Sequence, residues 1–463
     1  MTKSNSGKVA LIFPGIGMRG FDCYGRSDDS VCNYLNHGLC SISSYAKQQG
    51  YEVSGLDLRQ LKDWRHFTQK IIELAPAVVG FSIMSIDLLP ALEAIRLTKQ
   101  IDPGIVTIVG GVHPTIMLEQ MKQIEAIDVI VVGEGEAAFS KILGIIKSGG
   151  ELDRVYQGEP ADLDALPWID RDLFDVKAEL FHPFIKSLPA PFVTLNVGRG
   201  CPYNCTFCQP AERQVFGNRV RMRSVDNVIA ELAYLHGKYQ FNSFMVHDDL
   251  FTYDKKWILR FCEAYNKLGL KKKFVCQSRA DIVSNNEELI KEMKRAGLAC
   301  LIIGFESGSQ RILDFIKKGT TVEQNLRAAE ICKKHGIEIF ANYMLGLPTE
   351  TKDEVEQTVR MIEKIDPEYD SPAYFTPHPG SELFAYCREH RLSLIQDHDV
   401  DRSPKSTKIK GVDYQYLAAR LKYLKWKRLF KKASNKLRGI IAHWRYLWQY
   451  FPRRDIRGSN GNI

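Results

Sequence analysis

Short apolar runs alternate with amphipathic, helix-length segments along two long stretches of this chain. In the first stretch the apolar runs occupy residues 8–13, 52–56, 77–82, 105–109 and 129–132. Helix-like segments occupy residues 39–49, 88–100 and 136–147. This alternation favours a parallel sheet with helices on both faces, because parallel strands need a long crossover connection. We therefore predict an α/β fold that begins with a doubly wound N-terminal domain over residues 1–147.

The alternation resumes near residue 192 and continues to about residue 375. The apolar runs there occupy residues 192–197, 243–247, 274–278, 300–305, 337–344 and 372–375. The helix-like segments between them occupy residues 225–239, 255–268, 287–296, 322–335 and 352–365. Six strands with intervening helices predict a partial (β/α)6 barrel in a core domain at residues 191–390. Residues 148–190 are rich in proline and are predicted to form a linker without regular elements.

Three closely spaced cysteines follow the first strand of the predicted barrel. Cys201, Cys205 and Cys208 have the spacing C-x3-C-x2-C. Three thiolates on one loop suit an iron–sulfur cluster, and with no fourth cysteine nearby one iron would lack a protein ligand. An open coordination position is typical of a metal centre that carries out chemistry. The alternatives are buried structural cysteines or a zinc knuckle, but the loop supplies no fourth Cys or His for zinc.

The cysteine spacing, Phe207 before the third cysteine and the Gly-Arg-Gly segment at 198–200 together resemble the radical S-adenosylmethionine superfamily. The resemblance implies that a [4Fe-4S] cluster, held by the three cysteines, chelates S-adenosylmethionine at its open iron. It further implies that the reduced cluster cleaves S-adenosylmethionine to a 5′-deoxyadenosyl radical, which removes hydrogen from the substrate. Catalysis is therefore predicted to depend on Cys201, Cys205 and Cys208.

Polar residues at the ends of the later barrel strands are the candidate contacts of S-adenosylmethionine. They are Asp248 for its amino group or ribose, Arg279 for its carboxylate, Glu306 for ribose hydroxyls and Gly346 for close approach of adenine. Each has an alternative interpretation. A carboxylate at a strand end often caps the next helix, and Arg279 could form a surface ion pair with Asp281.

Three loops at the strand ends of the first domain resemble the cobalamin-binding domain that precedes many radical S-adenosylmethionine cores. They comprise residues 81–85, 110–115 and 133–136 and combine glycines with hydroxyl side chains. The candidate cobalamin contacts in these loops are Ser82, Ser85, Gly110, Gly111, His113, Thr115, Gly133 and Glu134. The alternative is a flavodoxin-like domain that binds no cobalamin. The string Asp-x-His-x-x-Gly is absent, so we expect no histidine on the lower face of cobalt.

The C-terminal extension, residues 391–463, is strongly basic. Sixteen Lys or Arg residues and two acidic residues lie from Lys405 to Arg457, so this region carries a charge of roughly +14. Because the net charge of the whole chain is +8, the rest of the chain is mildly acidic, at roughly −6. Aromatic residues are interleaved with these cations in predicted helices at 414–432 and 440–451. A basic helix with aromatics suits an anionic membrane surface, although it could also cover the barrel or meet nucleic acid. We expect a peripheral membrane contact and no nucleic-acid partner.

The first residues lack the apolar core of a signal peptide, and no apolar run reaches the length of about 18 residues that a membrane-spanning helix requires. A cytoplasmic protein is therefore expected, with a peripheral position on the inner membrane surface as a further possibility.

Family resemblance points to the cobalamin-binding radical enzymes, which include the anaerobic magnesium-protoporphyrin monomethyl ester cyclases and the class B radical methyltransferases. It implies methyl transfer to, or cyclase-type oxidation of, an unactivated carbon of a small-molecule or lipid-like substrate. It also implies a reductant protein such as flavodoxin or ferredoxin. The two alternatives are a radical enzyme whose first domain holds no cobalamin and a non-enzymatic iron–sulfur electron carrier.

Overall fold

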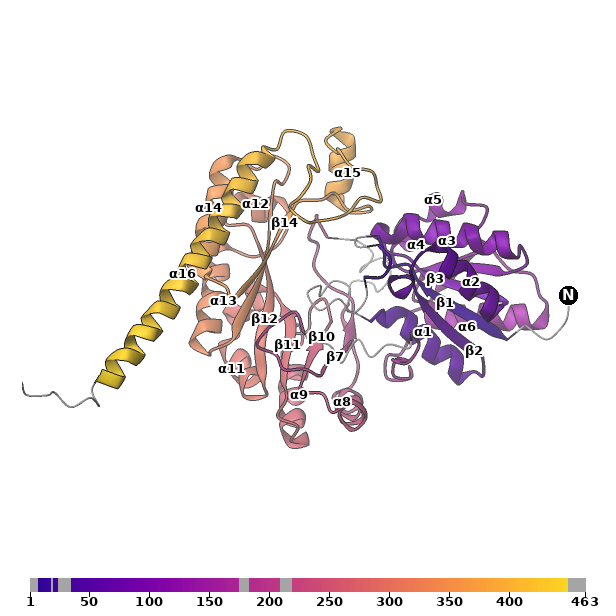
Figure 1. Ribbon diagram of the computed structural model, residues 1–463, viewed down its shortest axis with the longest axis horizontal. Helices are drawn as coiled ribbons and strands as arrows, with labels where there is room; N and C mark the ends of the chain where they lie inside the picture. Colours follow the sequence, from indigo (N-terminus) through magenta and orange to yellow (C-terminus); the bar gives the residue numbers. More distant parts are fainter. Residues whose placement is uncertain (1–6, 18–19, 24–34, 175–182, 209–218, 449–463) are drawn as a thin grey trace, which may run out of the picture. The chain divides into compact units, whose positions relative to one another are not determined.

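The computed structural model describes residues 7–17, 20–23, 35–174, 183–208 and 219–448, with side chains up to residue 431. The chain divides into two compact units, Met1–Val412 and Asp413–Ile463, and the first unit contains two six-stranded parallel sheets (Figure 1). The predicted α/β class, with two successive parallel sheets and a helical C-terminal region, is confirmed. The predicted domain boundaries at 147, 190 and 390 stay predictions.

The first sheet has the strand order β2-β1-β3-β4-β5-β6, and every pairing is parallel. Its strands are β1 (Lys8–Phe13), β2 (Glu52–Asp57), β3 (Val78–Ser82), β4 (Val106–Gly110), β5 (Val129–Gly133) and β6 (Val155–Gly158). The strand order reverses at β1, because the chain proceeds to β2 on one side and to β3 on the other. In open α/β sheets, ligands bind beyond the carboxyl ends of the strands at such a switch point.

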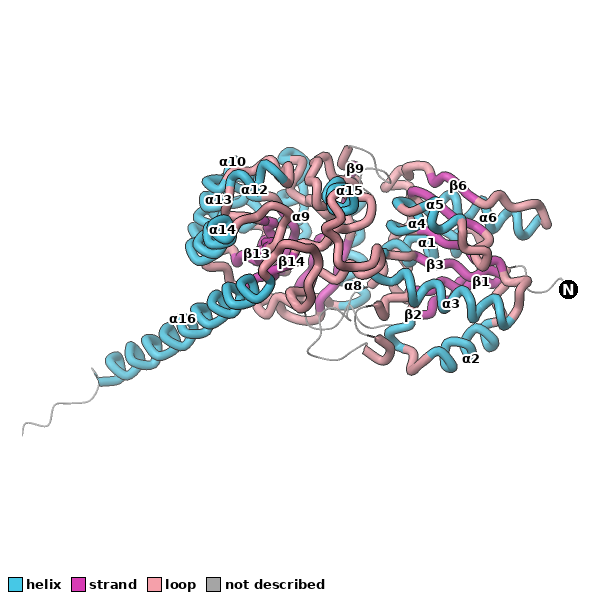
Figure 2. The backbone as a smooth tube through the Cα atoms, turned by 90° about the horizontal axis from the view of Figure 1, so that it is seen from above, coloured by secondary structure: helices cyan, strands magenta, loops and turns pink. Residues whose placement is uncertain are grey.

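Helices cover both faces of this sheet, and each face has its own apolar core (Figure 2). On β1, Val9 and Leu11 belong to the core under α1 and α6, whereas Ala10 and Ile12 belong to the core under α2 and α3. Successive side chains of a strand point to opposite faces, so a strand buried on both sides is apolar throughout. The helices are α1 (His37–Gln48), η2 (Leu58–Gln60), α2 (Trp64–Leu74), η3 (Ser85–Asp87), α3 (Leu88–Ile101), α4 (Val112–Ile116), α5 (Leu118–Lys122) and α6 (Gly135–Ser148).

Several elements of the first domain were not predicted from the sequence, among them β6, α2 and the short helices α4 and α5. The prediction that residues 148–190 lack regular elements was wrong, because β6 pairs with β5 and extends the sheet. Four residues are too few for a clear apolar pattern, and the strand is stabilised by the backbone of its neighbour. Helix α2 was also missed, although Asp63 caps it by accepting a hydrogen bond from the N–H of His66 (2.8 Å).

The second sheet has the order β14-β13-β12-β11-β10-β7, again with parallel pairing throughout. Its strands are β7 (Phe192–Leu195), β10 (Ser243–Val246), β11 (Lys273–Ser278), β12 (Leu298–Glu306), β13 (Glu338–Leu345) and β14 (Tyr369–Tyr374). Since β7 and β14 form opposite edges, the sheet is an open barrel, as predicted.

Helices of the barrel follow its strands in the βα alternation that the sequence predicted. They are α8 (Val225–Tyr239), α9 (Lys255–Leu268), α10 (Ala280–Asn285), α11 (Glu287–Arg295), α12 (Gln310–Phe315), α13 (Val322–Lys334), α14 (Lys352–Ile365) and α15 (Glu382–Glu389). Two two-residue strands, β8 (Gly198–Arg199) and β9 (Arg221–Met222), pair antiparallel on either side of the cysteine loop. Asp254 and Ser309 cap α9 and α12 through their side chains.

The second unit contains one long helix, α16 (Tyr414–Trp448). The prediction of two separate helices was wrong, because Gly439 lies inside the helix and does not end it. A glycine inside a helix costs only about 1 kcal/mol relative to alanine, whereas proline, which first recurs at Pro452, would break it. In the described part of the chain, α16 and every other helix is too short or too polar to cross a membrane.

Gly158 on β6 offers a test of how the first sheet supports the loop after β5. A Cβ atom added at Gly158 would lie 1.8 Å from the carbonyl oxygen of Glu134. We expect Gly158→Ala to lower the free energy of unfolding by roughly 1–3 kcal/mol, because the loop backbone must move to make room.

Gly144→Ala is the matched control, since Gly144 lies within α6 and a Cβ there meets nothing within 4 Å. It should raise stability by up to about 1 kcal/mol through helix propensity. Thermal unfolding followed by circular dichroism compares the two variants, and an unchanged melting temperature for Gly158→Ala would contradict the close approach.

Candidate functional site

The cysteine loop is held from two sides by main-chain hydrogen bonds. The N–H of Cys208 donates to the carbonyl of Cys205 (3.1 Å) and closes a turn. Thr206 donates its N–H to the carbonyl of Ile316 (3.0 Å) and accepts from the N–H of Leu383 (3.0 Å). Backbone pairing of this kind orders the loop without using the thiols, which remain available for a metal.

Apolar packing and nearby positive charge surround this loop. Phe207 packs against a buried apolar cluster that includes Leu347 and Phe375. Arg279 Nη1 lies 3.8 Å from the Sγ of Cys205, and Lys318 Nζ lies 5.7 Å from the centroid of the Phe207 ring. Positive groups beside thiolates stabilise the anionic form that binds iron.

None of the three cysteines forms a disulfide within the described part of the chain; Cys201 and Cys205 are half-buried and Cys208 is exposed. Burial raises the pKa of the Cys201 thiol, so binding iron there would release a proton. Among the described residues, no three His, Cys, Asp or Glu side chains converge on a single metal ion. A cubane cluster does not need such convergence, because its cysteines bind different irons. Three soft ligands on one ordered loop therefore fit an iron–sulfur cluster.

Asp248 lies at the end of β10, buried against the start of the cysteine loop. One carboxylate oxygen accepts a hydrogen bond from the N–H of Val197 (2.7 Å). Burial raises its pKa to about 7, although hydrogen bonds from the backbone of Val197 and Gly198 oppose the shift. Asp248 also lines the cavity described below, so it borders both the cysteine loop and the first domain.

Arg279 and Glu306 are brought together by a residue that the sequence reasoning missed, Lys318. Arg279 Nη2 donates to the carbonyl of Lys318 (2.5 Å), and Lys318 Nζ donates to Glu306 Oε1 (2.8 Å). Burial would lower the pKa of Lys318, but the charges of Glu306 and Cys205 outweigh it and the pKa is raised, so Lys318 stays charged. Lys318 follows another lysine in the sequence, a pattern more typical of surface charge.

The alternative pairing of Arg279 with Asp281 also exists, with Nε to Oδ1 at 3.0 Å, but it is buried rather than on the surface. The Arg279 guanidinium further lies 3.5 Å from the centroid of the Tyr203 ring, on the cysteine loop. Gly346 follows β13 with φ of +78°, and its N–H donates to Glu350 (2.6 Å). Glycine adopts this backbone conformation without strain, so the loop can turn directly after β13.

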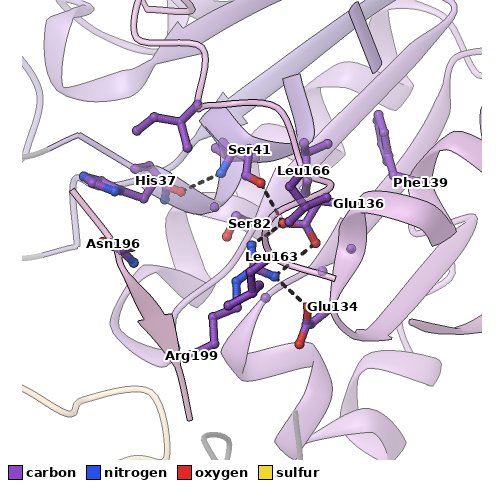
Figure 3. A pocket seen from close by; sticks show the side chains of 18 of the residues that line it. His37, Ser41, Ser82, Glu134, Glu136, Phe139, Leu163, Leu166, Asn196 and Arg199 are labelled. Atoms are coloured by element: carbon purple, nitrogen blue, oxygen red, sulfur yellow. Dashed lines mark hydrogen bonds and ion pairs between the residues drawn. The ribbon is translucent and has the colours of Figure 1, made fainter. Parts of the chain in front are cut away.

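A cavity of about 490 Å³ opens at the carboxyl ends of the first sheet, within the range of small-molecule sites (Figure 3). Five of the eight predicted cobalamin contacts line it: Ser82, Gly110, Gly111, Gly133 and Glu134. Gly111 has φ of +94°, and a Cβ atom there would lie 3.0 Å from the Ser82 hydroxyl. The glycines leave the cavity wall without side chains at these positions, so a flat ligand such as a corrin can lie close to the backbone.

The other three predicted cobalamin contacts form a hydrogen-bonded network behind the cavity wall. His113 is fully buried, with Nδ1 bonded to Ser85 (2.9 Å) and Nε2 to Gln120 (3.2 Å). Burial lowers the pKa of His113 to about 4, so it is neutral at pH 7. Thr115 accepts from the N–H of Gly133 (3.2 Å). Side chains of this network are occupied in ordering the loops.

Glu134 does line the cavity, but its carboxylate already has partners. It binds Arg199 (2.7 Å) and Arg221 from the barrel and accepts from the N–H of Ala161 (3.1 Å). Glu136 binds Arg199 at 2.6 Å. Burial would raise the pKa of Glu136, but the charge of Arg199 outweighs it and the pKa is lowered. The segments that contain these residues, Gly-Arg-Gly and Gly-Glu-Gly-Glu, were singled out in the sequence, but their pairing was not predicted.

His37, which the sequence analysis did not select, lies at the start of α1 and lines the same cavity. Its Nε2 is 2.7 Å from the Thr194 hydroxyl, and its Nδ1 is buried without a hydrogen-bond partner among the residues that the structure describes. Burial, with the charges of Arg171 and His247, lowers its pKa well below the usual range. The ring is therefore neutral at pH 7.

Comparison with known protein families yields two matches. The Radical SAM superfamily model matches residues 195–362, and the B12 binding domain model matches residues 33–143. The first match contains the three cysteines, and the second contains the glycine-lined loops at the carboxyl ends of β3, β4 and β5.

Individual relatives cover most of the chain. An uncharacterized methyltransferase of Pyrococcus horikoshii is 30% identical over 377 residues, covering 78% of this chain and 80% of its own. The anaerobic magnesium-protoporphyrin IX monomethyl ester cyclase of Rubrivivax gelatinosus is 30% identical over 68% of this chain, which spans 59% of the cyclase. The structure of OxsB, a cobalamin-dependent S-adenosylmethionine radical enzyme, has the same fold, with a TM-score of 0.68 at 19% identity over 86% of this chain and 64% of OxsB.

Replacing the three cysteines tests whether the loop holds iron. Cys201→Ala, Cys205→Ala and Cys208→Ala should each abolish most of the iron and sulfide bound after anaerobic reconstitution, because each removes a soft ligand. Iron and sulfide analysis with visible absorption spectra measures the loss. Cys387→Ala is the control, since Cys387 is buried in an apolar cluster and should keep the full iron content. Retention of four irons by all three loop variants would contradict the assignment.

Proposed function

The chain belongs to the radical S-adenosylmethionine superfamily and carries a B12 binding domain, and on this basis we propose that it transfers a methyl group to an unactivated carbon of a small-molecule substrate. It is a radical S-adenosylmethionine enzyme whose cofactors are a [4Fe-4S] cluster, S-adenosylmethionine and cobalamin. The observation that carries the proposal is the meeting, within one compact unit, of a three-cysteine loop and a glycine-walled cavity of the B12 binding domain.

Methyl transfer is favoured over cyclase-type oxidation by the extent of the similarity. The archaeal methyltransferase is matched over 80% of its length, whereas the cyclase of Rubrivivax gelatinosus is matched over 59%. Cyclase-type oxidation remains the second candidate, because that cyclase is equally 30% identical. We further propose a lipid-like or tetrapyrrole-like substrate as the class to test first.

The proposed roles of the residues follow from their surroundings. When bound, the cluster with S-adenosylmethionine supplies radical chemistry, and cobalamin supplies a methyl carrier. Cys201, Cys205 and Cys208 would hold the cluster, while Phe207 excludes water from it. Arg279 offers a guanidinium to the ligand carboxylate close to Cys205.

Three further residues complete the proposed S-adenosylmethionine site. Glu306, which is ion-paired with Lys318, would accept hydrogen bonds from ribose hydroxyls. Asp248 would bind the amino group, and the backbone at Gly346 would lie against the adenine. In the B12 binding domain, Ser82, Gly110, Gly111 and Gly133 are the proposed cobalamin contacts, with Ser85, His113 and Thr115 ordering their loops and Glu134 held by arginine.

Reductive cleavage of S-adenosylmethionine tests the proposed function. Reconstituted protein with cobalamin and a low-potential reductant should release 5′-deoxyadenosine, and a methyl group labelled on S-adenosylmethionine should appear in the product. A Glu306→Gln variant should need about tenfold more S-adenosylmethionine for half-maximal rate, because a charge-assisted hydrogen bond is worth roughly 1.5–3 kcal/mol. Label in the product distinguishes methyl transfer from oxidation. If protein with an intact cluster releases no 5′-deoxyadenosine, the proposed function is wrong.

Two partners of the enzyme are also proposed. A flavodoxin or ferredoxin is the proposed electron donor, since the half-exposed cysteine loop leaves the cluster position near solvent. The second is an anionic membrane surface on the cytoplasmic side, contacted by α16. On this helix the exposed aromatics Tyr423, Trp426 and Phe430 share one face. Lysines and arginines flank the aromatic face, which suits the boundary between acyl chains and anionic headgroups.

Vesicle binding tests the role of α16. The full-length protein should sediment with phosphatidylglycerol-containing vesicles, but weakly with phosphatidylcholine vesicles, and less at high salt. The double variant Trp426→Glu/Phe430→Glu should lose most of the binding, because these side chains are 51% and 66% exposed and would enter the interface. Ile72→Glu is the control, since Ile72 on α2 is 59% exposed and outside the helix. Equal binding of all variants would overturn the membrane assignment.

A further inference from the structure

Two arginines of the barrel and two glutamates of the B12 binding domain form one set of ion pairs, here called the interdomain ion cluster. Arg199 reaches both carboxylates, with Nη1 2.7 Å from Glu134 Oε2 and Nη2 2.6 Å from Glu136 Oε1 (Figure 3). Arg221 binds the other oxygen of Glu134. Four residues from distant parts of the sequence are thus joined into a single network of charge-assisted hydrogen bonds.

The interdomain ion cluster lies at the base of both cofactor loops. Arg199 precedes Cys201 by two residues, and its partner across the β8–β9 pair is Arg221. Glu134 and Glu136 stand at the start of α6, directly after β5, and line the cavity of the B12 binding domain. The network therefore connects the loop that holds the cluster to the loop that borders the cobalamin cavity.

Because the two carboxylates are buried, they require these ion pairs. The side chains of Glu134 and Glu136 are 1% and 5% exposed, and those of Arg199 and Arg221 are 20% and 25% exposed. A buried carboxylate without its cation is strongly unfavourable, so each glutamate depends on the barrel for neutralisation. The planar guanidinium also accepts only a narrow geometry, unlike an apolar contact that tolerates sliding.

Other hydrogen bonds restrict the glutamates to this arrangement. The hydroxyl of Ser41 donates to Glu136 Oε1 (2.7 Å), and the N–H of Ala161 donates to Glu134 Oε2 (3.1 Å). Arg221 Nη1 donates to the carbonyl of Ala161 (2.7 Å). Apart from the Nε of Arg221, which has no hydrogen-bond partner among the described residues, the polar atoms named here are bonded to one another. Each glutamate is fixed by donors from more than one segment, so displacing one loop disturbs the other.

We propose that the interdomain ion cluster couples the two cofactor sites, with Arg199 as a positioning residue. Cobalamin in the cavity orders the β5–α6 loop and its glutamates, which hold Arg199 and the base of the cysteine loop. Iron bound to the cysteines orders the same network from the other side. Each cofactor therefore raises the affinity for the other, and the coupling is equal in both directions. This inference rests on the proposed function, because it requires both cofactors to bind.

The test is the affinity for hydroxocobalamin, measured by absorbance titration of the full-length protein with and without its reconstituted iron–sulfur cluster. The unaltered protein should bind cobalamin at least about fivefold more tightly when the cluster is present, the lower end of typical couplings. Arg199→Gln and Glu136→Gln should bring this ratio close to one while both forms still bind cobalamin. Arg199→Lys keeps the positive charge but cannot bind both carboxylates through separate guanidinium nitrogens. Its ratio should therefore lie between those of Arg199→Gln and the unaltered protein.

Arg154→Gln is the matched control. Arg154 also secures a loop, donating to the carbonyls of Lys122 (3.3 Å) and Ile124 (2.8 Å), but it connects only the start of β6 to the loop after α5 and makes no contact with the barrel through these bonds. Its ratio should equal that of the unaltered protein. A second readout is the electron paramagnetic resonance spectrum of protein that holds both the reduced cluster and cob(II)alamin. The magnetic interaction between the two centres should change in Arg199→Gln and stay unchanged in Arg154→Gln.

The outcomes separate this inference from the proposed function. A ratio of one in the unaltered protein, or an unchanged ratio in Arg199→Gln, would overturn the coupling while leaving the enzyme assignment intact. Failure of the unaltered protein to bind cobalamin in either form would overturn the cobalamin-dependent function and the coupling together. If Arg199→Gln does not fold, the comparison of Arg199→Lys with Arg154→Gln decides the question, since Arg199→Lys retains the charge.

Discussion

Parallel strand pairing is the constraint on which the rest of this structure depends. Both sheets are parallel throughout, so the connections that follow the strands of each sheet all leave at the same edge. At the carboxyl ends of the second sheet lie the cysteine loop, Asp248, Arg279 and Glu306. The glycine loops lie at the carboxyl ends of the first sheet. A parallel sheet needs helices on its faces, which directs the chemistry of both domains to the strand ends.

Ion pairs join these two sets of loops. Glu134 and Glu136 are buried at the start of α6 and are neutralised by Arg199 and Arg221 of the barrel. A second group, Arg171 and Arg223 around Glu231, lies at the cavity as well. Buried ion pairs add little net stability, but they are sensitive to geometry. Such contacts suit a protein that must hold two cofactors in a defined relation.

The cluster environment shows how neighbouring groups determine the charge of buried residues. Lys318 is buried, yet its charge is retained because Glu306 and Cys205 lie beside it. Arg279 connects the same lysine to the cysteine loop through its main-chain carbonyl. The cysteine loop thus lies beside the cations of Arg279 and Lys318 in a partly apolar surrounding, which suits the proposed binding of the carboxylate of S-adenosylmethionine.

Local sequence patterns determined the fold class, the strand order along the chain and the three candidate cluster ligands. Short apolar runs and helical apolar patterns are local properties, and Cys201, Cys205 and Cys208 lie within eight residues. One sequence therefore suffices to identify them. Such patterns were too weak for β6, whose four residues depend on β5, and for the continuity of α16 through Gly439.

What the tertiary structure alone decided is which polar residues meet. It assigned the carboxylate of Glu134 to arginines, enclosed His113 in a network behind the cavity, and placed Lys318 between Arg279 and Glu306. These partners are separated by tens of residues in the sequence, and a buried charge is stable only where the fold supplies its counter-charge. Sequence spacing carries no record of that long-range neutralisation, so only the three-dimensional arrangement could reveal it.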